Sequence, residues 1–130
     1  MNELALLAFD QPNLLGPLEG LDDSALDNLD FGVIGFDAQT AVRRYNAAES
    51  KLAGLAPHRV LGNPLFTTVA PCMNNFLVAQ RFEDAAASAT PLDATLDYVF
   101  TLRMRPTKVR LRLLASPAPG LRYVLVNRRT

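Results

Sequence analysis

Three side chains of this sequence, a thiol, a phenol and a carboxyl, have the chemistry of a functional site if the fold brings them together. Cys72 is the only cysteine, and a thiolate is a good nucleophile towards an activated acyl group. It follows Pro71, whose fixed φ places the thiol on a defined bend. Tyr45 and Glu49 lie four residues apart and offer a phenolic O–H and a carboxyl group. A pocket lined by all three would make a site.

Taken separately, each residue has a simpler explanation. A lone cysteine is commonly buried in the core. Local sequence favours Glu49 as an exposed capping-box residue, at position N3 of a helix that Asn46 caps. Tyr45 fits a surface tyrosine at the end of a strand. A cysteine-dependent acyl-transfer enzyme is a weaker alternative, because the only histidine, His58, follows a proline and would have to reach Cys72 as the general base.

Hydrophobic periodicity and turn residues predict the elements that must position these groups. In order, they are a short helix over 21–29, strands over 31–36 and 41–45, short helices over 46–54 and 57–62, an apolar segment over 65–69, a full helix over 76–88, and strands over 98–104, 108–113 and 121–127. Phe76 and Leu77 are predicted on the apolar face of the full helix. Arg110 and Arg112 are predicted on the solvated face of the sheet.

This order of elements predicts an α+β fold. We expect a five-stranded antiparallel sheet with helices on one face and an N-terminal helical cap. PAS domains have the same order, hold small ligands between sheet and helices, and serve as sensors. We assign residues 1–30 to the cap and residues 31–130 to the PAS core of a single domain.

Composition narrows the class of protein. The chain has 130 residues, of which 49% are hydrophobic and 20% charged, as is ordinary for one globular domain. No apolar run is long enough to span a bilayer, and the N-terminus lacks the basic region of a signal peptide. One cysteine cannot form an internal disulfide, and one cysteine with one histidine argues against a zinc site. We therefore predict a cytoplasmic protein without a membrane partner.

Charge is unevenly distributed along the chain. Residues 1–42 carry eight acidic groups and no basic one, whereas residues 98–130 carry eight basic groups and no acidic one, and the net charge is zero. Neutrality favours contact between the two ends over nucleic-acid binding. We hypothesise that an acidic cap lies over a basic sheet face; the residues concerned are Asp22, Asp23 and Asp27 in the cap and Arg110 and Arg112 in the sheet.

Several short segments resemble the photoactive yellow protein family, whose members are blue-light sensors with a PAS fold. The resemblance runs from about Leu21 to the C-terminus. The matching segments are Phe31-Gly32-Val33-Ile34, Tyr45-Asn46-Ala47-Ala48-Glu49, Leu61-Gly62-Asn63, Val69-Ala70-Pro71-Cys72, Tyr98-Val99-Phe100 and Met104-Arg105-Pro106-Thr107-Lys108-Val109. Each is short, but together, in this order and with family-like spacing, they are specific.

The resemblance implies a p-coumaroyl chromophore joined to Cys72 as a thioester. By this resemblance, Tyr45 and a protonated Glu49 hold its phenolate oxygen. Light isomerises the double bond from trans to cis, Glu49 passes its proton to the phenolate, and the buried carboxylate drives partial unfolding. The resemblance also implies a signalling module, a monomer or weak dimer, that acts on an unidentified downstream protein and is not an enzyme.

The residue types agree with this chemistry. A phenol with a pKa of about 10 stays ionised in a pocket only if hydrogen-bond donors favour its anion. Tyrosine and neutral carboxyl O–H groups are such donors. Burial beside an anion raises a carboxyl pKa, and an unpaired buried carboxylate costs several kcal/mol, comparable to a small domain's stability.

The chain departs from the family pattern at some pocket positions. Ala53 stands where the family usually has a threonine, Leu55 where it has a lid arginine, and Leu102 where it has a tyrosine. The connection after Cys72 is about two residues shorter than usual. The expected pocket wall comprises Ile34, Ala53, Leu55, Phe66, Tyr98, Phe100 and Met104. These departures keep open the alternative of a PAS sensor that binds another ligand or dimerises without photochemistry.

Overall fold

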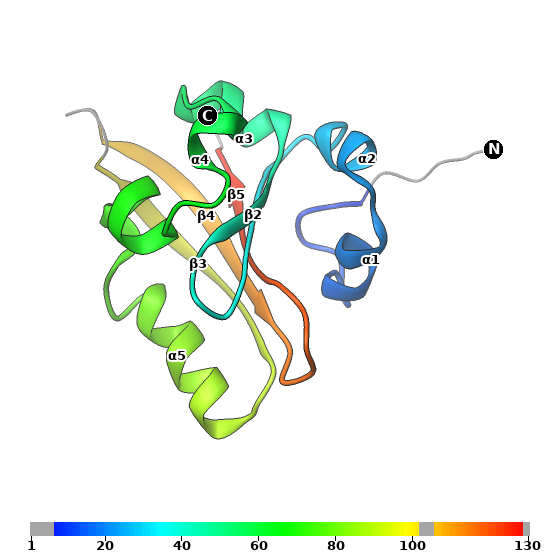
Figure 1. Ribbon diagram of the computed structural model, residues 1–130, viewed down its shortest axis with the longest axis vertical. Coiled ribbons are helices and arrows are strands. Elements are labelled where there is room, and N and C mark those ends of the chain that lie inside the picture. Colours follow the sequence, from blue (N-terminus) through cyan, green and yellow to red (C-terminus); the bar gives the residue numbers. More distant parts are fainter. Residues whose placement is uncertain (1–6, 102–105, 129–130) are drawn as a thin grey trace.

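The computed structural model describes residues 7–101 and 106–128 of the chain, which form an antiparallel sheet between two groups of helices (Figure 1). The helices are α1 (Leu15–Gly20), α2 (Asp23–Asp27), α3 (Ala47–Ala53), α4 (Pro57–Val60) and α5 (Ala79–Ser88), with a π-helical turn at Leu65–Val69 and a 3-10 turn at Pro71–Met73. The strands are β1 (Gly32–Phe36), β2 (Val42–Tyr45), β3 (Leu92–Phe100), β4 (Thr107–Ala115) and β5 (Arg122–Asn127).

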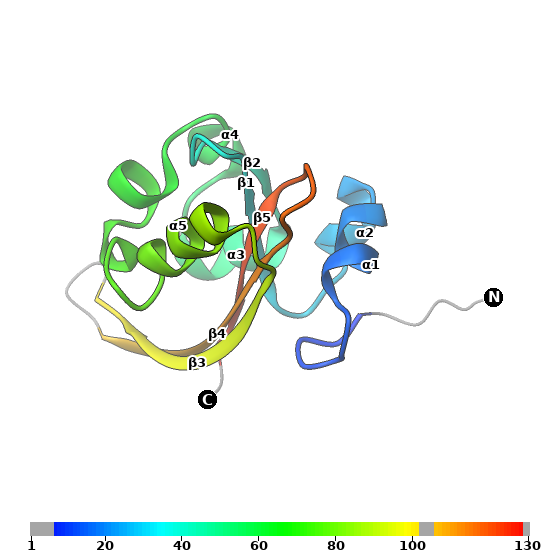
Figure 2. The same cartoon turned by 90° about the horizontal axis from the view of Figure 1, so that it is seen from below.

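The sheet has the order β2-β1-β5-β4-β3, and all its pairings are antiparallel. Figure 2 shows α1 and α2 on one side of the sheet and α3, α4 and α5 on the other. We call the first side the cap face and the second the helix face. The first and last strands of the chain meet in the centre, where Ile34 of β1 pairs with Val124 of β5.

Both faces of the central strands β1 and β5 are buried, and the alternation of side chains along the strands separates two apolar clusters. In β5, Val124 and Val126 join the helix-face cluster, whereas Tyr123 and Leu125 join the cap-face cluster. The cap-face cluster also contains Leu14, Leu18, Leu26 and Leu29 of the N-terminal segment. The leucines of this segment therefore cover the sheet with apolar surface.

Two arginines of the sheet fasten the N-terminal segment. Arg112 donates from Nη1 to the carbonyl oxygens of Phe9 and Gln11 at 2.9 and 2.6 Å, and it forms a two-bond pair with Asp93. Arg44 donates to the carbonyl oxygens of Leu18 and Leu21 at 2.9 and 2.6 Å. Guanidinium groups that satisfy backbone carbonyls thus fasten the cap in addition to its buried leucines.

The hypothesis that the acidic cap lies over the basic sheet face holds only in part: the N-terminal segment lies over Arg112, but the carboxylates of Asp22, Asp23 and Asp27 form no ion pair with Arg110 or Arg112 in the described part of the chain. Arg110 pairs with Asp97 of β3, and Asp22 instead caps α2 by accepting from the Ala25 amide. Asp27 accepts from the Ala47 amide at the start of α3. The predicted solvent exposure of Arg112 was also wrong, since its side chain is only 7% exposed.

Helix α1 was not among the predicted elements, and two elements begin three or more residues away from the predicted start. Helix α5 begins at Ala79, and Phe76 and Leu77 lie exposed before it rather than on its apolar face. Asn75 explains this late start, because its side chain accepts from the Leu77 and Val78 amides and holds this segment in a turn. Strand β3 begins at Leu92, earlier than predicted, because it pairs with β4 along its whole length. Leu102 and Met104 lie outside the described residues.

Candidate functional site

Asn46 fixes the geometry of the segment that carries Tyr45 and Glu49. Its side chain is fully buried, and Oδ1 accepts from the Glu49 amide at 3.2 Å, which caps α3 as predicted. Oδ1 also accepts from the Val33 amide, while Nδ2 donates to the carbonyl oxygens of Leu26 and Phe31. One amide side chain therefore joins the cap, β1 and the first turn of α3. Gly54, with φ of +74°, ends the helix as predicted.

Glu49 is buried, which local sequence did not favour. The capping box is only half formed, because the Asn46 amide donates to the Val33 carbonyl and the Glu49 side chain turns inward. Glu49 Oε2 accepts from Arg128 Nη2 at 2.9 Å, and the two side chains are 5% and 14% exposed. A Cβ at Gly32 would overlap Glu49 Oε1, so the carboxyl packs directly on the backbone of β1.

The environment of Glu49 raises the pKa of its carboxyl above the ordinary value for glutamate. Burial raises the pKa of Glu49 from 4.5 to about 7, although the Arg128 guanidinium opposes this rise. Tyr45, at the end of β2, is also buried, and its phenol pKa is raised by burial and by the nearby Glu49 carboxyl. Tyr45 and Glu49 are thus both buried, and the pKa of each is raised.

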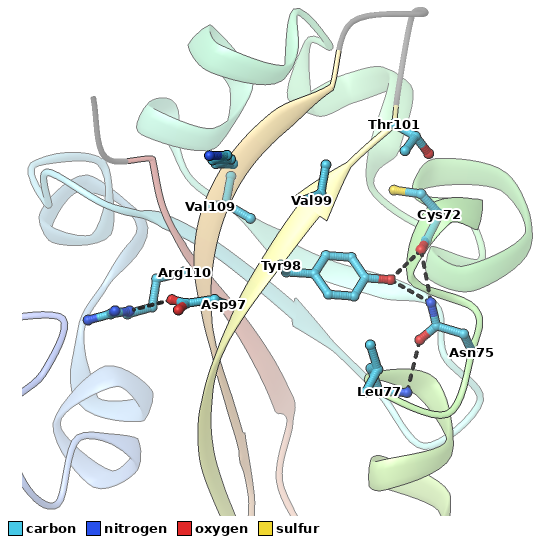
Figure 3. Close-up of a pocket in the computed structure, with 10 residues that line it drawn as sticks. Cys72, Asn75, Leu77, Asp97, Tyr98, Val99, Thr101, Val109 and Arg110 are labelled. Carbon is cyan, nitrogen blue, oxygen red and sulfur yellow. Dashed lines mark hydrogen bonds and ion pairs between the residues drawn. The ribbon is translucent and has the colours of Figure 1, made fainter.

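Cys72 lies in the 3-10 turn that follows the π-helical turn, and it is half-buried. Tyr98 of β3 donates its O–H to the Cys72 carbonyl oxygen, and Asn75 Nδ2 donates both to that carbonyl and to the Tyr98 oxygen (Figure 3). These bonds fasten the cysteine turn to the sheet. Burial raises the pKa of the Cys72 thiol, and a hydrogen bond with the Thr101 backbone opposes the rise.

A pocket of about 830 Å³ opens beside Cys72. Its lining residues are Cys72, Asn75, Leu77, Asp97, Tyr98, Val99, Thr101, Lys108, Val109 and Arg110. Of the predicted site residues, Cys72 and Tyr98 line this pocket. Tyr45 and Glu49 do not, so the expectation of one pocket lined by thiol, phenol and carboxyl was wrong: the thiol pocket and the buried Tyr45 and Glu49 are the two ends of the candidate site.

Aromatic contacts connect the two ends. The rings of Tyr98 and Phe100 meet edge to face with centroids 6.0 Å apart. The Arg128 guanidinium carbon lies 5.2 Å from the centroid of the Phe100 ring. Since Arg128 also binds Glu49, a line of contacts runs from the Cys72 carbonyl to the Glu49 carboxyl.

The remaining predicted wall residues belong to the helix-face cluster or border it. Ile34, Tyr45, Phe66, Tyr98 and Phe100 are members of the cluster, and Leu55 and Cys72 pack against it half-buried. Ala53 is half-buried at the end of α3. His58 is exposed on α4 and makes no described contact with Cys72. The thiol and the Tyr45 phenol therefore border one apolar interior.

Sequence reasoning missed three residues of this site: Gly32, Asn75 and Arg128. Arg128 lies 79 positions from Glu49 in the chain, so no local pattern connects the two. Gly32 belongs to a segment that resembles the family, but its role depends on the carboxyl packed against it. Asn75 precedes a helix as capping residues often do, which is the one signal that was available.

Two classes of site receive no support in the part of the chain that the structure describes. No group of three or more His, Cys, Asp or Glu side chains there could hold a metal ion. Within the same residues, no helix combines the length and apolar character needed to cross a bilayer.

Comparison with known proteins defines the family. A family model described as PAS fold matches residues 26–129. The chain is 30% identical over 125 residues to photoactive yellow protein from Rhodothalassium salexigens, which spans 96% of this chain and 99% of that protein. It is 32% identical over 123 residues to photoactive yellow protein from Halochromatium salexigens, with 95% and 98% covered. The chain belongs to the photoactive yellow protein family.

A solved structure of this family has the same fold. The photoactive yellow protein domain of the sensor histidine kinase Ppr from Rhodospirillum centenum is 37% identical, with a TM-score of 0.79, and the match covers 86% of this chain and 97% of that domain. The predicted family and the predicted five-stranded PAS fold are therefore confirmed. Two of these relatives are named photoactive yellow protein, and the third is a photoactive yellow protein domain from a sensor histidine kinase.

Proposed function

We propose that this chain is a blue-light photoreceptor domain that carries a p-coumaroyl group as a thioester on Cys72. The observation that carries the proposal is the buried Glu49 carboxyl, whose pKa burial raises to about 7 and whose charge acts on the buried Tyr45 phenol. Its Oε1 atom is buried without a hydrogen-bond partner among the described residues. A buried polar atom of this kind suits a polar ligand group.

Cys72 is the attachment point in this proposal. It is the only thiol of the chain and lines a pocket large enough for an aromatic acyl group. Attachment requires the thiol to lose its proton; the sulfur then bonds to the carbonyl carbon of an activated acyl donor, whose leaving group departs with its electron pair. Tyr98 and Asn75 hold the Cys72 carbonyl during this reaction and so keep the thiol at the pocket wall.

Tyr45 and Glu49 are the proposed partners of the phenolate end. Both pKa values are raised, so both groups keep the protons that they donate to an anion. When bound, the p-coumaroyl group supplies absorption of blue light and a double bond that light isomerises. Glu49 would then give its proton to the phenolate oxygen, and the carboxylate left in the interior would destabilise the packing around α3. Asn46 connects that helix to the cap through the Leu26 carbonyl.

The same proposal covers location and partners. We place the protein in the cytoplasm, where its free thiol stays reduced. A change at α3 that reaches the cap offers a surface for a downstream signalling protein, whose identity the chain does not specify.

Reconstitution tests the function. The protein is incubated with an activated p-coumaroyl ester, and intact mass and visible absorption are recorded before and after blue light. We expect one added acyl group, a visible absorption band, and bleaching that reverses in the dark. Cys72→Ala should show none of these, whereas Asn74→Ala, two residues away on the exposed part of the turn, should behave as the parent.

The outcome separates the two functions that the sequence left open. Attachment without visible absorption or bleaching would remove the photoreceptor proposal and leave a PAS sensor for another ligand. Attachment to a residue other than Cys72 would remove the proposed anchor.

A further inference from the structure

Arg128 connects the C-terminal end of β5 to the interior of the site. The residue follows the last strand, and its side chain reaches Glu49 with Nη2 and Oε2 2.9 Å apart. Both side chains are almost entirely shielded from water, at 14% and 5% exposure. An ion pair so shielded is screened little by salt and acts strongly on both members.

The aromatic wall holds the guanidinium in this position. Its central carbon lies 5.2 Å from the Phe100 centroid, a favourable distance for a cation over an aromatic face. Phe100 in turn contacts Tyr98, which binds the Cys72 carbonyl. Arg128 therefore lies between the wall of the Cys72 pocket and the buried carboxyl.

The pair is incompletely bonded. Arginine and a carboxylate can form two parallel hydrogen bonds, yet Arg128 Nε and Glu49 Oε1 are both buried without a partner among the described residues. Oε1 packs against the backbone of Gly32. The bond from Arg128 favours the charged carboxyl, whereas burial favours the neutral one. Since Nε and Oε1 also stay without partners, either protonation state of Glu49 can be held.

We propose that Arg128 is the counter-ion of Glu49 and sets how readily this carboxyl releases and regains its proton. Arg128 is a positioning residue in this scheme, because it acts on Glu49 and not on the acyl group. Its consequence for the light response rests on the proposed function: a carboxylate formed beside a buried cation destabilises the interior less than an unpaired one. Arg128 thus limits how far the packing around α3 loosens when Glu49 is ionised.

Among residues 7–101 and 106–128, few other charges act on Glu49. Tyr45 of β2 is the titratable neighbour, and Gly32 of β1 carries no side chain. Asp27 of α2 and Lys51 of α3 are exposed. Arg128 is accordingly the cation that opposes the effect of burial on this carboxyl.

The test uses the full chain without chromophore, so that it does not depend on photochemistry. The chain has four glutamates, at positions 3, 19, 49 and 83, so NMR of carboxyl-labelled glutamate resolves each titration, and Glu49→Gln assigns the signal. We expect Arg128→Gln and Arg128→Met to raise the Glu49 midpoint by about one pH unit or more, as loss of an adjacent opposite charge does. Arg43→Gln, which removes an exposed arginine paired with Asp37, should leave it unchanged.

Each result decides the matter. A Glu49 midpoint that stays the same in both Arg128 variants overturns the proposal. At pH 5 the Glu49 carboxyl is neutral and needs no counter-ion, so both variants should be folded there; loss of the fold at pH 5 would assign Arg128 a purely structural role instead. If the midpoints shift but the reconstituted parent does not bleach, the counter-ion stands and the photoreceptor proposal fails.

Discussion

Buried charged side chains on the two faces of the sheet differ in how many of their hydrogen bonds are formed. On the cap face, Arg112 uses Nε, Nη1 and Nη2 in four hydrogen bonds, two to Asp93 and two to backbone carbonyls. Arg44 likewise bonds two carbonyls and the Tyr123 hydroxyl. On the helix face, Arg128 and Glu49 share one bond and leave Nε and Oε1 without partners among the described residues.

This difference separates a structural use of charge from a responsive one. A buried charge with all its hydrogen bonds made has one favourable arrangement and fixes the segments it joins. An ion pair in which some hydrogen-bonding atoms have no partner is stabilised less by its geometry. Less free energy is therefore lost when one member changes its protonation state. The cap face therefore provides attachment, while the helix face can change state.

The largest effect is expected from the cap face. Arg112→Ala removes the cation from two backbone carbonyls and from Asp93, and we expect the free energy of unfolding to fall by about 3–5 kcal/mol. Urea denaturation measures this loss. Proteolysis should cut the 8–21 segment faster in the variant, because its carbonyls lose their anchor.

Arg110→Ala provides the matched control. Arg110 pairs with Asp97 on the same strands, but the two side chains are 43% and 82% exposed, so we expect a loss below about 1 kcal/mol. Equal losses in the two arginine variants would remove the distinction between a complete buried charge cluster and a surface pair.

On the helix face, Glu49 should make the free energy of unfolding depend on pH. The Glu49 pKa rises on folding from 4.5 to about 7, so in this window the folded protein binds the proton that the unfolded chain has lost. Stability from this group is therefore complete below the lower value and is lost as the pH rises through the upper one. Relative to Glu49→Gln, we expect the parent to lose about 3 kcal/mol across the window, at about 1.4 kcal/mol per pH unit.

Urea denaturation of parent and Glu49→Gln at matched pH values measures the difference. Asp37 and Asp93, whose pKa values are lowered by their arginine partners, titrate in both proteins and cancel. A difference that stays flat with pH, or that increases the stability of the parent, would contradict a buried carboxyl that is neutral in the fold.

The smallest effects are expected at two glycines of β1, one on each face of the sheet. Gly32 faces Glu49, and Gly35 faces the Tyr123 ring, whose Cε2 atom would lie 3.0 Å from an added Cβ. We expect Gly32→Ala to lower the free energy of unfolding by about 2 kcal/mol and Gly35→Ala by about 1 kcal/mol, both through overpacking.

A second substitution distinguishes the causes. Glu49→Ala makes room for the Cβ at position 32. The loss of unfolding free energy in the Gly32→Ala/Glu49→Ala double variant should therefore be much smaller than the sum of the two single losses. In the Gly35→Ala/Glu49→Ala double variant it should equal that sum. Denaturation of the two double variants measures this. Additivity in both would show that Gly32 serves the strand and not the carboxyl.

Local patterns were sufficient for the elements that depend on neighbours in the chain. Asn46 as a cap, Gly54 as a helix end and the alternation of β5 follow from capping, backbone and pleat geometry that a few residues determine. The order of these elements, together with the Tyr45–Glu49 and Val69–Cys72 segments, was enough to predict the PAS fold and the family.

Contacts between distant segments decided how the site is built. The capping-box pattern placed Glu49 at the surface, and only the return of β5 beside β1 buries it against Arg128, 79 residues away. The alternation of β4 placed Arg112 in solvent, whereas the N-terminal carbonyls, about a hundred residues away, draw it inside. The burial of a charge depends on which other chain segments supply its partners, and that is a property of the assembled sheet rather than of any stretch of sequence.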